Sequence, residues 1–405
     1  MKKTVFFMLS LCLLLSGCAS FGRGVAEAIM KPAEKNLGEC MVFTEGFDGI
    51  RDIMEKNNGR VKILMIHGIG KKSPGHSSSI AAALAYRLGL NTEIKNHKDI
   101  ILQSNNEPNA DIGHLRAYKY YNETNSQELI FYEYTWSSIA ERIKNDLSYD
   151  NYDLNAEKRT DINKKIKTFI NDTVIEPFIY LGNEQARNDI LTGVSQALCW
   201  AVGKNWEDMP SDGTYSCQSG NISNVEMLSE YVILTHSLGS QISIDTLENL
   251  ATKTAEYRAD KTKKINVTIY MFANQLPAIA IASNKPNITG QIDKYCKENA
   301  PLFSERLMDT TKIIAFSDPN DILSYSIPSK FENKYIDSRI CPEISNILVN
   351  VAPLSSIFGS MNANPLEAHL NYKNDERVIN LIIEGISSDT PQAPPHEGCY
   401  ITTTK

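Results

Sequence analysis

Six runs of apolar and β-branched residues recur along the chain, and most are continuous rather than alternating with polar positions. They lie at residues 61–68, 128–136, 231–237, 265–274, 311–318 and 344–353. Continuous runs are typical of strands buried on both faces, as in a parallel sheet. Helix-like stretches follow the first and third runs, at 78–90 and 240–257, and another lies at 377–386. This alternation predicts an α/β fold with a mostly parallel central sheet.

The stretch from about 138 to 228 interrupts the alternation. It is polar and mostly helix-like, and it carries scattered aromatic residues, among them Phe169, Phe178 and Trp200. A gap of this length between strands is too long for a plain loop. We expect a helical insertion, which either covers a site as a cap or lid or forms a further packing layer.

The first residues contain three successive regions. Two lysines precede an apolar stretch at 4–15, which is too short to span a bilayer as a helix, and the box Leu-Ser-Gly-Cys follows at 15–18. This arrangement resembles a bacterial lipoprotein signal, which implies removal of residues 1–17 and attachment of palmitate-type lipid to Cys18. An ordinary secretory signal or a short anchor is the alternative. Ala19 after the cysteine favours an outer-membrane protein on the periplasmic side of the cell envelope, anchored by its lipid.

The organisation that we expect is a signal peptide (1–17), an anchor and lead-in (18–60), a central domain (61–390) and a tail (391–405). Besides the lipidated Cys18, the mature chain then holds six cysteines: Cys40, Cys199, Cys217, Cys296, Cys341 and Cys399. An even number in an oxidising compartment predicts disulfides. Proximity favours the pairs Cys199–Cys217 and Cys296–Cys341, and Cys399 is positioned to pin the tail.

The net charge and the absence of certain motifs argue against two classes of partner, nucleic acids and metal ions. The formal net charge is −7, so the chain carries no basic footprint of the kind that nucleic-acid binding requires. Neither a C-x-x-C nor an H-E-x-x-H motif occurs, so the sequence supports no metal site. The oligomeric state is not predicted by any of these patterns.

The third run ends in Thr-His-Ser-Leu-Gly at 235–239, directly before a helix-like stretch. A serine nucleophile needs a base and an exposed position, and a sharp strand-to-helix turn with small residues on both sides provides the exposure. The motif resembles the nucleophile elbow of the α/β-hydrolase superfamily, with Ser237 as the nucleophile. Thr235 departs from the usual glycine. The competing interpretation is that Ser237 caps the helix.

The first run continues into His-Gly-Ile-Gly at 67–70 and resembles the oxyanion-hole strand of the same superfamily. By this resemblance, Gly68 and Gly70 let the backbone fold, and His67 braces the loop. The backbone N–H groups of Ile69 and Leu238 are then the expected oxyanion donors, a kind of group typically worth about 10²–10³ in rate.

The remaining triad members follow from the same resemblance. The fifth run leads into two aspartates, of which Asp321 fits the acid better because apolar residues follow it, and Asp318 is the alternative. The one that is not the acid is expected to be a turn residue. His369 lies after the last strand-like run, where the superfamily places its base. The order Ser237, Asp321, His369 is the superfamily's order.

The other histidines have simpler interpretations. His236 sits beside the nucleophile without being the base, and we expect His76, His97 and His114 to be surface or loop residues.

The resemblance implies a serine hydrolase with an acyl-enzyme intermediate and no cofactor. A lipid anchor and an aromatic-bearing insertion favour an acyl-ester or lipid substrate, as in a lipase, phospholipase or esterase. A peptidase or thioesterase would use the same residues, and a catalytically dead envelope binding module is the other alternative.

Overall fold

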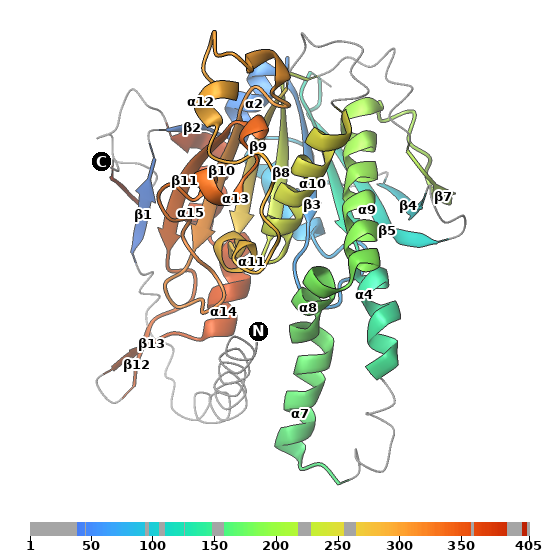
Figure 1. Cartoon of the computed structure of the whole chain (residues 1–405), viewed down its shortest axis with the longest axis vertical. Coiled ribbons are helices and arrows are strands. Elements are labelled where there is room, and N and C mark those ends of the chain that lie inside the picture. The colour runs from blue at the N-terminus through green and yellow to red at the C-terminus, as the bar shows by residue number, and fades with distance from the viewer. Residues whose placement is uncertain are drawn as a thin grey trace.

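An eleven-stranded sheet runs through the computed structural model of this chain (Figure 1). The structure describes residues 39–44, 46–93, 97–104, 110–124, 126–147, 158–217, 228–254, 265–357, 360–386 and 399–402. The predicted signal peptide at 1–17, the lipidation site Cys18 and residues 391–398 of the predicted tail lie outside these ranges. Within them, no helix is both long and apolar enough to cross a membrane.

Six neighbouring parallel strands form the centre of the sheet, in the order β11-β10-β9-β8-β3-β6. Their bounds are β3 Arg60–Ile66, β6 Glu128–Thr135, β8 Glu230–His236, β9 Asn266–Phe272, β10 Thr311–Ser317 and β11 Pro342–Val349. These are the six apolar runs of the sequence, so the prediction of an α/β fold with a mostly parallel sheet is confirmed. Such runs are buried on both faces because helices cover both sides of the sheet.

Alternate residues of β3 point into two separate cores. Ile63 and Met65 join a core that also contains residues of α2 (Ile50–Lys56), α3 (Ser78–Arg87) and α15 (Glu376–Glu384). Leu64 and Ile66 join the core on the other face, which α9 (Glu184–Gly203) and α10 (Gly239–Thr254) cover. The sheet is therefore the middle layer of three.

Shorter strands extend both edges of the sheet. β5 (Asp111–Tyr121) pairs antiparallel with β6, β4 (His97–Gln103) pairs antiparallel with β5, and β7 (Thr214–Tyr215) lies outermost. At the other edge, β1 (Cys40–Phe43) pairs with β11 and with β15 (Tyr400–Thr402). The sheet therefore extends beyond both limits of the predicted 61–390 domain. Two small ladders, β12–β13 (Ser355–Ile357, Ser360–Asn362) and β2–β14 (Phe47–Asp48, Gly385–Ile386), complete the strands.

The predicted insertion is helical, and its helices differ in their packing. It contains α4 (Ser137–Lys144), η1 (Asn145–Leu147), α7 (Asp161–Phe169), the π-helix η2 (Ile170–Val174), α8 (Ile175–Gly182) and α9. α9 packs against α10 and the sheet and buries ten of its residues, so this part is a packing layer. α7 buries none and projects past the end of the sheet (Figure 1). That a part of the insertion acts as a lid stays a prediction.

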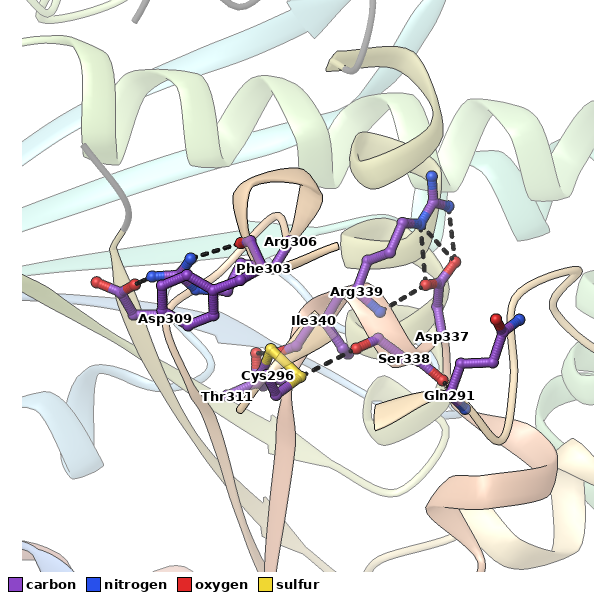
Figure 2. Close-up of a disulfide and its surroundings, with 11 residues drawn as sticks. Gln291, Cys296, Phe303, Arg306, Asp309, Thr311, Asp337, Ser338, Arg339 and Ile340 are labelled. Carbon is purple, nitrogen blue, oxygen red and sulfur yellow. Dashed lines mark hydrogen bonds and ion pairs between the residues drawn. A yellow bond between two sulfur atoms is a disulfide. The ribbon is translucent and has the colours of Figure 1, made fainter. Parts of the chain in front are cut away.

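Three disulfides connect distant parts of the described chain, namely Cys40–Cys399, Cys199–Cys217 and Cys296–Cys341. Both pairs expected from proximity are confirmed, and Cys399 ties β15 to β1. Figure 2 shows the surroundings of Cys296, whose Sγ lies 3.3 Å from the Ser338 carbonyl oxygen. This bridge joins the segment between β9 and β10 to the start of β11.

Short helical elements connect the strands and helices of the chain after β9. They are α11 (Leu276–Ala280), α12 (Ile292–Tyr295), η4 (Phe303–Glu305), α13 (Glu332–Tyr335), η5 (Ser338–Ile340), α14 (Pro365–Leu370) and η6 (Asn371–Asn374).

Candidate active site

Ser237 is the first residue of the two-residue turn, Ser237 and Leu238, between β8 and α10. Its φ of 56° lies in the left-handed region, which non-glycine residues adopt rarely and at an energetic cost. The backbone N–H of Ser237 donates to the Phe272 carbonyl over 2.9 Å, which holds the turn against β9. Its buried Oγ makes no hydrogen bond to any residue that the structure describes, so Ser237 does not cap α10. The helix-cap interpretation is therefore wrong.

Close packing explains the glycine after the serine. A Cβ added to Gly239 would lie 2.5 Å from the Ile66 carbonyl oxygen, because the first turn of α10 presses against β3. Thr235, the departure from the usual motif, is fully buried between β3 and β9. The turn thus needs a glycine on its helix side and accepts a threonine on its strand side.

The loop after β3 lies directly against the serine. A Cβ on Gly68 would come within 2.5 Å of the Ser237 Cβ and 3.0 Å of the Leu238 nitrogen. The predicted oxyanion loop and the predicted nucleophile are therefore neighbours. Within the described ranges, the backbone N–H groups of Ile69 and Leu238 donate no hydrogen bond, so both remain available for a ligand.

His67 braces this loop, as the sequence predicts. Its Nε2 accepts a hydrogen bond from the Trp136 backbone N–H over 3.0 Å, so its Nδ1 carries the proton and donates to the Gly68 carbonyl at 2.7 Å. The ring also stacks on Trp136 at 4.8 Å. Complete burial lowers the pKa of His67 well below its ordinary value, which keeps the ring neutral in this tautomer.

His369 and Asp321 form a close pair. His369 lies on α14, and its Nδ1 is 3.0 Å from Asp321 Oδ1 and 2.9 Å from Oδ2. The carboxylate also accepts from the Leu323 backbone N–H at 3.0 Å and from the Tyr372 hydroxyl at 3.3 Å. The second ring nitrogen of His369, Nε2, is buried and has no partner among the described residues. An aspartate at Nδ1 leaves Nε2 unprotonated and able to accept a proton.

Asp318 has the other role that the sequence left open. Its carboxylate accepts from the backbone N–H groups of Asn320 and Val351, each at 2.7 Å, and of Ala352 at 3.3 Å. It therefore organises the turn after β10 and joins it to the segment after β11. Burial raises the pKa of Asp318 above its ordinary value, against the effect of these hydrogen bonds. Of the two aspartates, only Asp321 contacts His369.

His236 connects the serine turn to the histidine. Its Nε2 donates to the His369 carbonyl over 2.8 Å, and the two rings meet edge to face at 5.0 Å. Burial, and then the neighbouring His369, lower the pKa of His236 to about 3. His236 is thus a neutral donor that holds α14 beside the turn, a contact that the sequence motif did not indicate.

The expectation that the other three histidines are surface or loop residues is confirmed for His97, which is exposed on β4, and for His76. His114 lies on β5, and its side chain is 32% exposed. His76 lies in a loop but is mostly buried, 3.3 Å from the fully buried carboxylate of Glu133. In the part of the chain that the structure describes, no group of three or more His, Cys, Asp or Glu residues is arranged to hold a metal ion.

The exposed position that the sequence predicts for the serine is not observed, because Ser237 is fully buried in this structure. A serine on a strained turn, a histidine oriented by a carboxylate and unused backbone N–H groups are the components that acyl transfer uses. Comparison with models of protein families, with curated proteins and with solved structures finds no match to this chain. The function of this chain is therefore inferred from the geometry of the site itself.

Proposed function

We propose that this protein is a serine hydrolase of the α/β-hydrolase type, which cleaves a carboxylic ester through an acyl-enzyme on Ser237. The observation that carries the proposal is a set of two buried atoms that have no hydrogen-bond partner among the described residues, not even each other: Ser237 Oγ on its strained turn, and Nε2 of the His369 ring that Asp321 orients. The His236 hydrogen bond holds His369 next to this turn. A buried polar atom without a partner calls for an explanation, and a catalytic role is one of those available.

The mechanism assigns each group one task. His369 Nε2 takes the hydroxyl proton as Ser237 Oγ attacks the carbonyl carbon of the ester, and Asp321 stabilises the resulting imidazolium. The tetrahedral oxyanion accepts hydrogen bonds from the N–H groups of Ile69 and Leu238. Collapse expels the alcohol, which receives the proton from His369. Water, deprotonated by His369, then attacks the acyl-enzyme and releases the carboxylic acid.

Exposed apolar side chains on α7, α8 and α14 favour an acyl-chain substrate. Leu366 and Leu370 on α14 flank His369 and are 54% and 41% exposed. Phe169 and Phe178, on α7 and α8, are 37% and 43% exposed. Figure 1 shows α7, α8 and α14 at the same end of the molecule. Exposed apolar groups near a site provide contacts for a hydrocarbon chain. With the lipoprotein-like signal, they favour a lipase, phospholipase or esterase that is anchored at a membrane.

Labelling with a fluorophosphonate probe tests the proposal, because only an activated serine reacts with it quickly. We expect the wild type to be labelled, and Ser237→Ala and His369→Ala to lose labelling. Ser195→Ala is the matched control, because among the described residues the hydroxyl of this α9 serine bonds only to the Leu191 carbonyl, at 2.7 Å. Hydrolysis of p-nitrophenyl esters of increasing chain length then compares short with long acyl groups. A folded wild type that is not labelled and cleaves no ester would overturn the proposal in favour of a binding module.

A further inference from the structure

A buried ion pair lies beneath the oxyanion loop. Glu176, on α8, is 1% exposed, and its Oε1 is 2.8 Å from the Lys144 Nζ at the end of α4. Its other oxygen, Oε2, accepts a hydrogen bond from the backbone N–H of Gly70 over 2.6 Å. A carboxylate from the helical insertion thus contacts the residue next to Ile69.

Lys144 holds this carboxylate in place through contacts on three elements. Besides Glu176, its Nζ lies 2.6 Å from Glu141 Oε1 on α4 and 3.0 Å from the Asp172 carbonyl oxygen in the π-helix η2. Removing a carboxylate from water is costly, and a close cation with further hydrogen bonds offsets the cost. The pair therefore links α4, η2 and α8 to the oxyanion loop.

The contact matters because of where it lies on the backbone. A trans peptide is planar, so its N–H points away from its C=O. His67 holds the Gly68 carbonyl and so directs the N–H of Ile69. Glu176 holds the N–H of Gly70 and so fixes the next peptide plane. The two peptide groups on either side of the Ile69 Cα are fixed by two different side chains, and one of these belongs to the insertion.

We infer that Glu176 is a positioning residue, through which the helical insertion sets the direction of the Ile69 N–H in the oxyanion hole. This role rests on the proposed hydrolase function. Glu176 touches neither the substrate nor the reacting atoms. It acts through Gly70, and a donor that moves by about 1 Å can lose about 100-fold in rate.

Steady-state hydrolysis of p-nitrophenyl butyrate by Glu176→Leu and Glu176→Gln tests this role. We expect kcat of the leucine variant to fall about 100-fold with KM changed less than about 2-fold, because the oxyanion forms only in the transition state. The glutamine variant keeps an acceptor oxygen but loses the charge, so we expect a smaller loss of about 10-fold.

The same two substitutions at Glu230 are the matched control. Glu230 is also buried, accepts from the Thr268 hydroxyl at 2.6 Å, and begins β8 at the end opposite Ser237. We expect its variants to lower the melting temperature and leave kcat unchanged. A leucine variant at Glu176 with wild-type kcat, or equal losses of kcat at both sites, would overturn the inference.

Hydrogen exchange of the Gly70 amide gives a readout that does not depend on activity. We expect faster exchange in Glu176→Leu than in the wild type, and no change in Glu230→Leu. Equal exchange in all three proteins would overturn the role of the contact. A wild type that cleaves no ester is the failure of the hydrolase proposal and removes this inference with it. An active wild type with an unaffected Glu176→Leu variant removes the inference alone.

Discussion

The side chain of His236 donates a hydrogen bond from Nε2 to the backbone carbonyl of His369 over 2.8 Å. These residues are 133 positions apart, on the strand-to-helix turn and on α14. The bond fixes the helix that carries the proposed base relative to the proposed nucleophile. His236 donates this bond as a neutral ring protonated at Nε2, because burial lowers its pKa.

The burial of His236 predicts that the free energy of unfolding falls in acid. The pKa of His236 is lowered from its ordinary 6.5 to about 3. Below pH 6.5 the unfolded chain binds a proton that the folded chain does not bind until about pH 3. The contribution of His236 to the free energy of unfolding is therefore complete above pH 6.5. It decreases as the pH falls towards 3, by at most about 1.4 kcal/mol per pH unit.

Urea unfolding of the wild type and of His236→Asn at pH 7.5, 5.5 and 4.5 measures this effect. The variant should lose less stability per pH unit. Some dependence should remain, because burial also lowers the pKa of His67. Identical slopes in the two proteins would contradict the assignment to His236.

The two aspartates after β10 should differ in their effects. Asp321→Asn removes the charge that orients His369, and we expect kcat to fall about 10⁴-fold. Asp318→Asn disturbs backbone hydrogen bonds instead, and we expect a loss of about 1–3 kcal/mol in the free energy of unfolding with little change in kcat. Ester hydrolysis and urea unfolding of both variants separate these outcomes, and a larger kcat loss in Asp318→Asn would reverse the roles.

The contact between α10 and β3 predicts a cost for any side chain at position 239. Gly239→Ala places its Cβ 2.5 Å from the Ile66 carbonyl oxygen. We expect this overpacking to lower the free energy of unfolding by about 1–3 kcal/mol or more. Gly182→Ala is the matched control, because a Cβ there meets no atom within 4 Å. Urea midpoints of the two variants give the comparison, and a neutral Gly239→Ala would show that the helix can shift.

Each disulfide should stabilise the fold according to the length of the chain segment that it closes into a loop. Cys40 and Cys399 are 359 positions apart, whereas Cys199 and Cys217 are 18 apart. On the chain-entropy model, removing the first bridge lowers the free energy of unfolding by about 6 kcal/mol and removing the second by about 3 kcal/mol. Thermal unfolding of two double variants tests this order. One replaces Cys40 and Cys399 by serine, and the other replaces Cys199 and Cys217 by serine. Mass spectrometry without reductant should find none of these six thiols free.

The sequence alone determined the central sheet. Strands buried on both faces need continuous apolar residues, and this local pattern located β3, β6, β8, β9, β10 and β11 within a few residues. Strands β4 and β5, which lie towards one edge of the sheet, were not predicted from the sequence. One face of β5 is only partly buried, and its pattern of apolar and polar residues is mixed. Their pairing depends on neighbours that are distant in the sequence.

The sequence also indicated the serine turn, since the crowding of a strand-to-helix turn selects small residues locally. It favoured Asp321 as the acid and left Asp318 as the alternative, because both follow the same strand and only the position of α14 decides which one meets His369. Glu176 carries no local signal at all. Its role arises where α8 packs beneath the loop after β3, and only the tertiary structure brings these segments together, because each is placed by the core on which it packs.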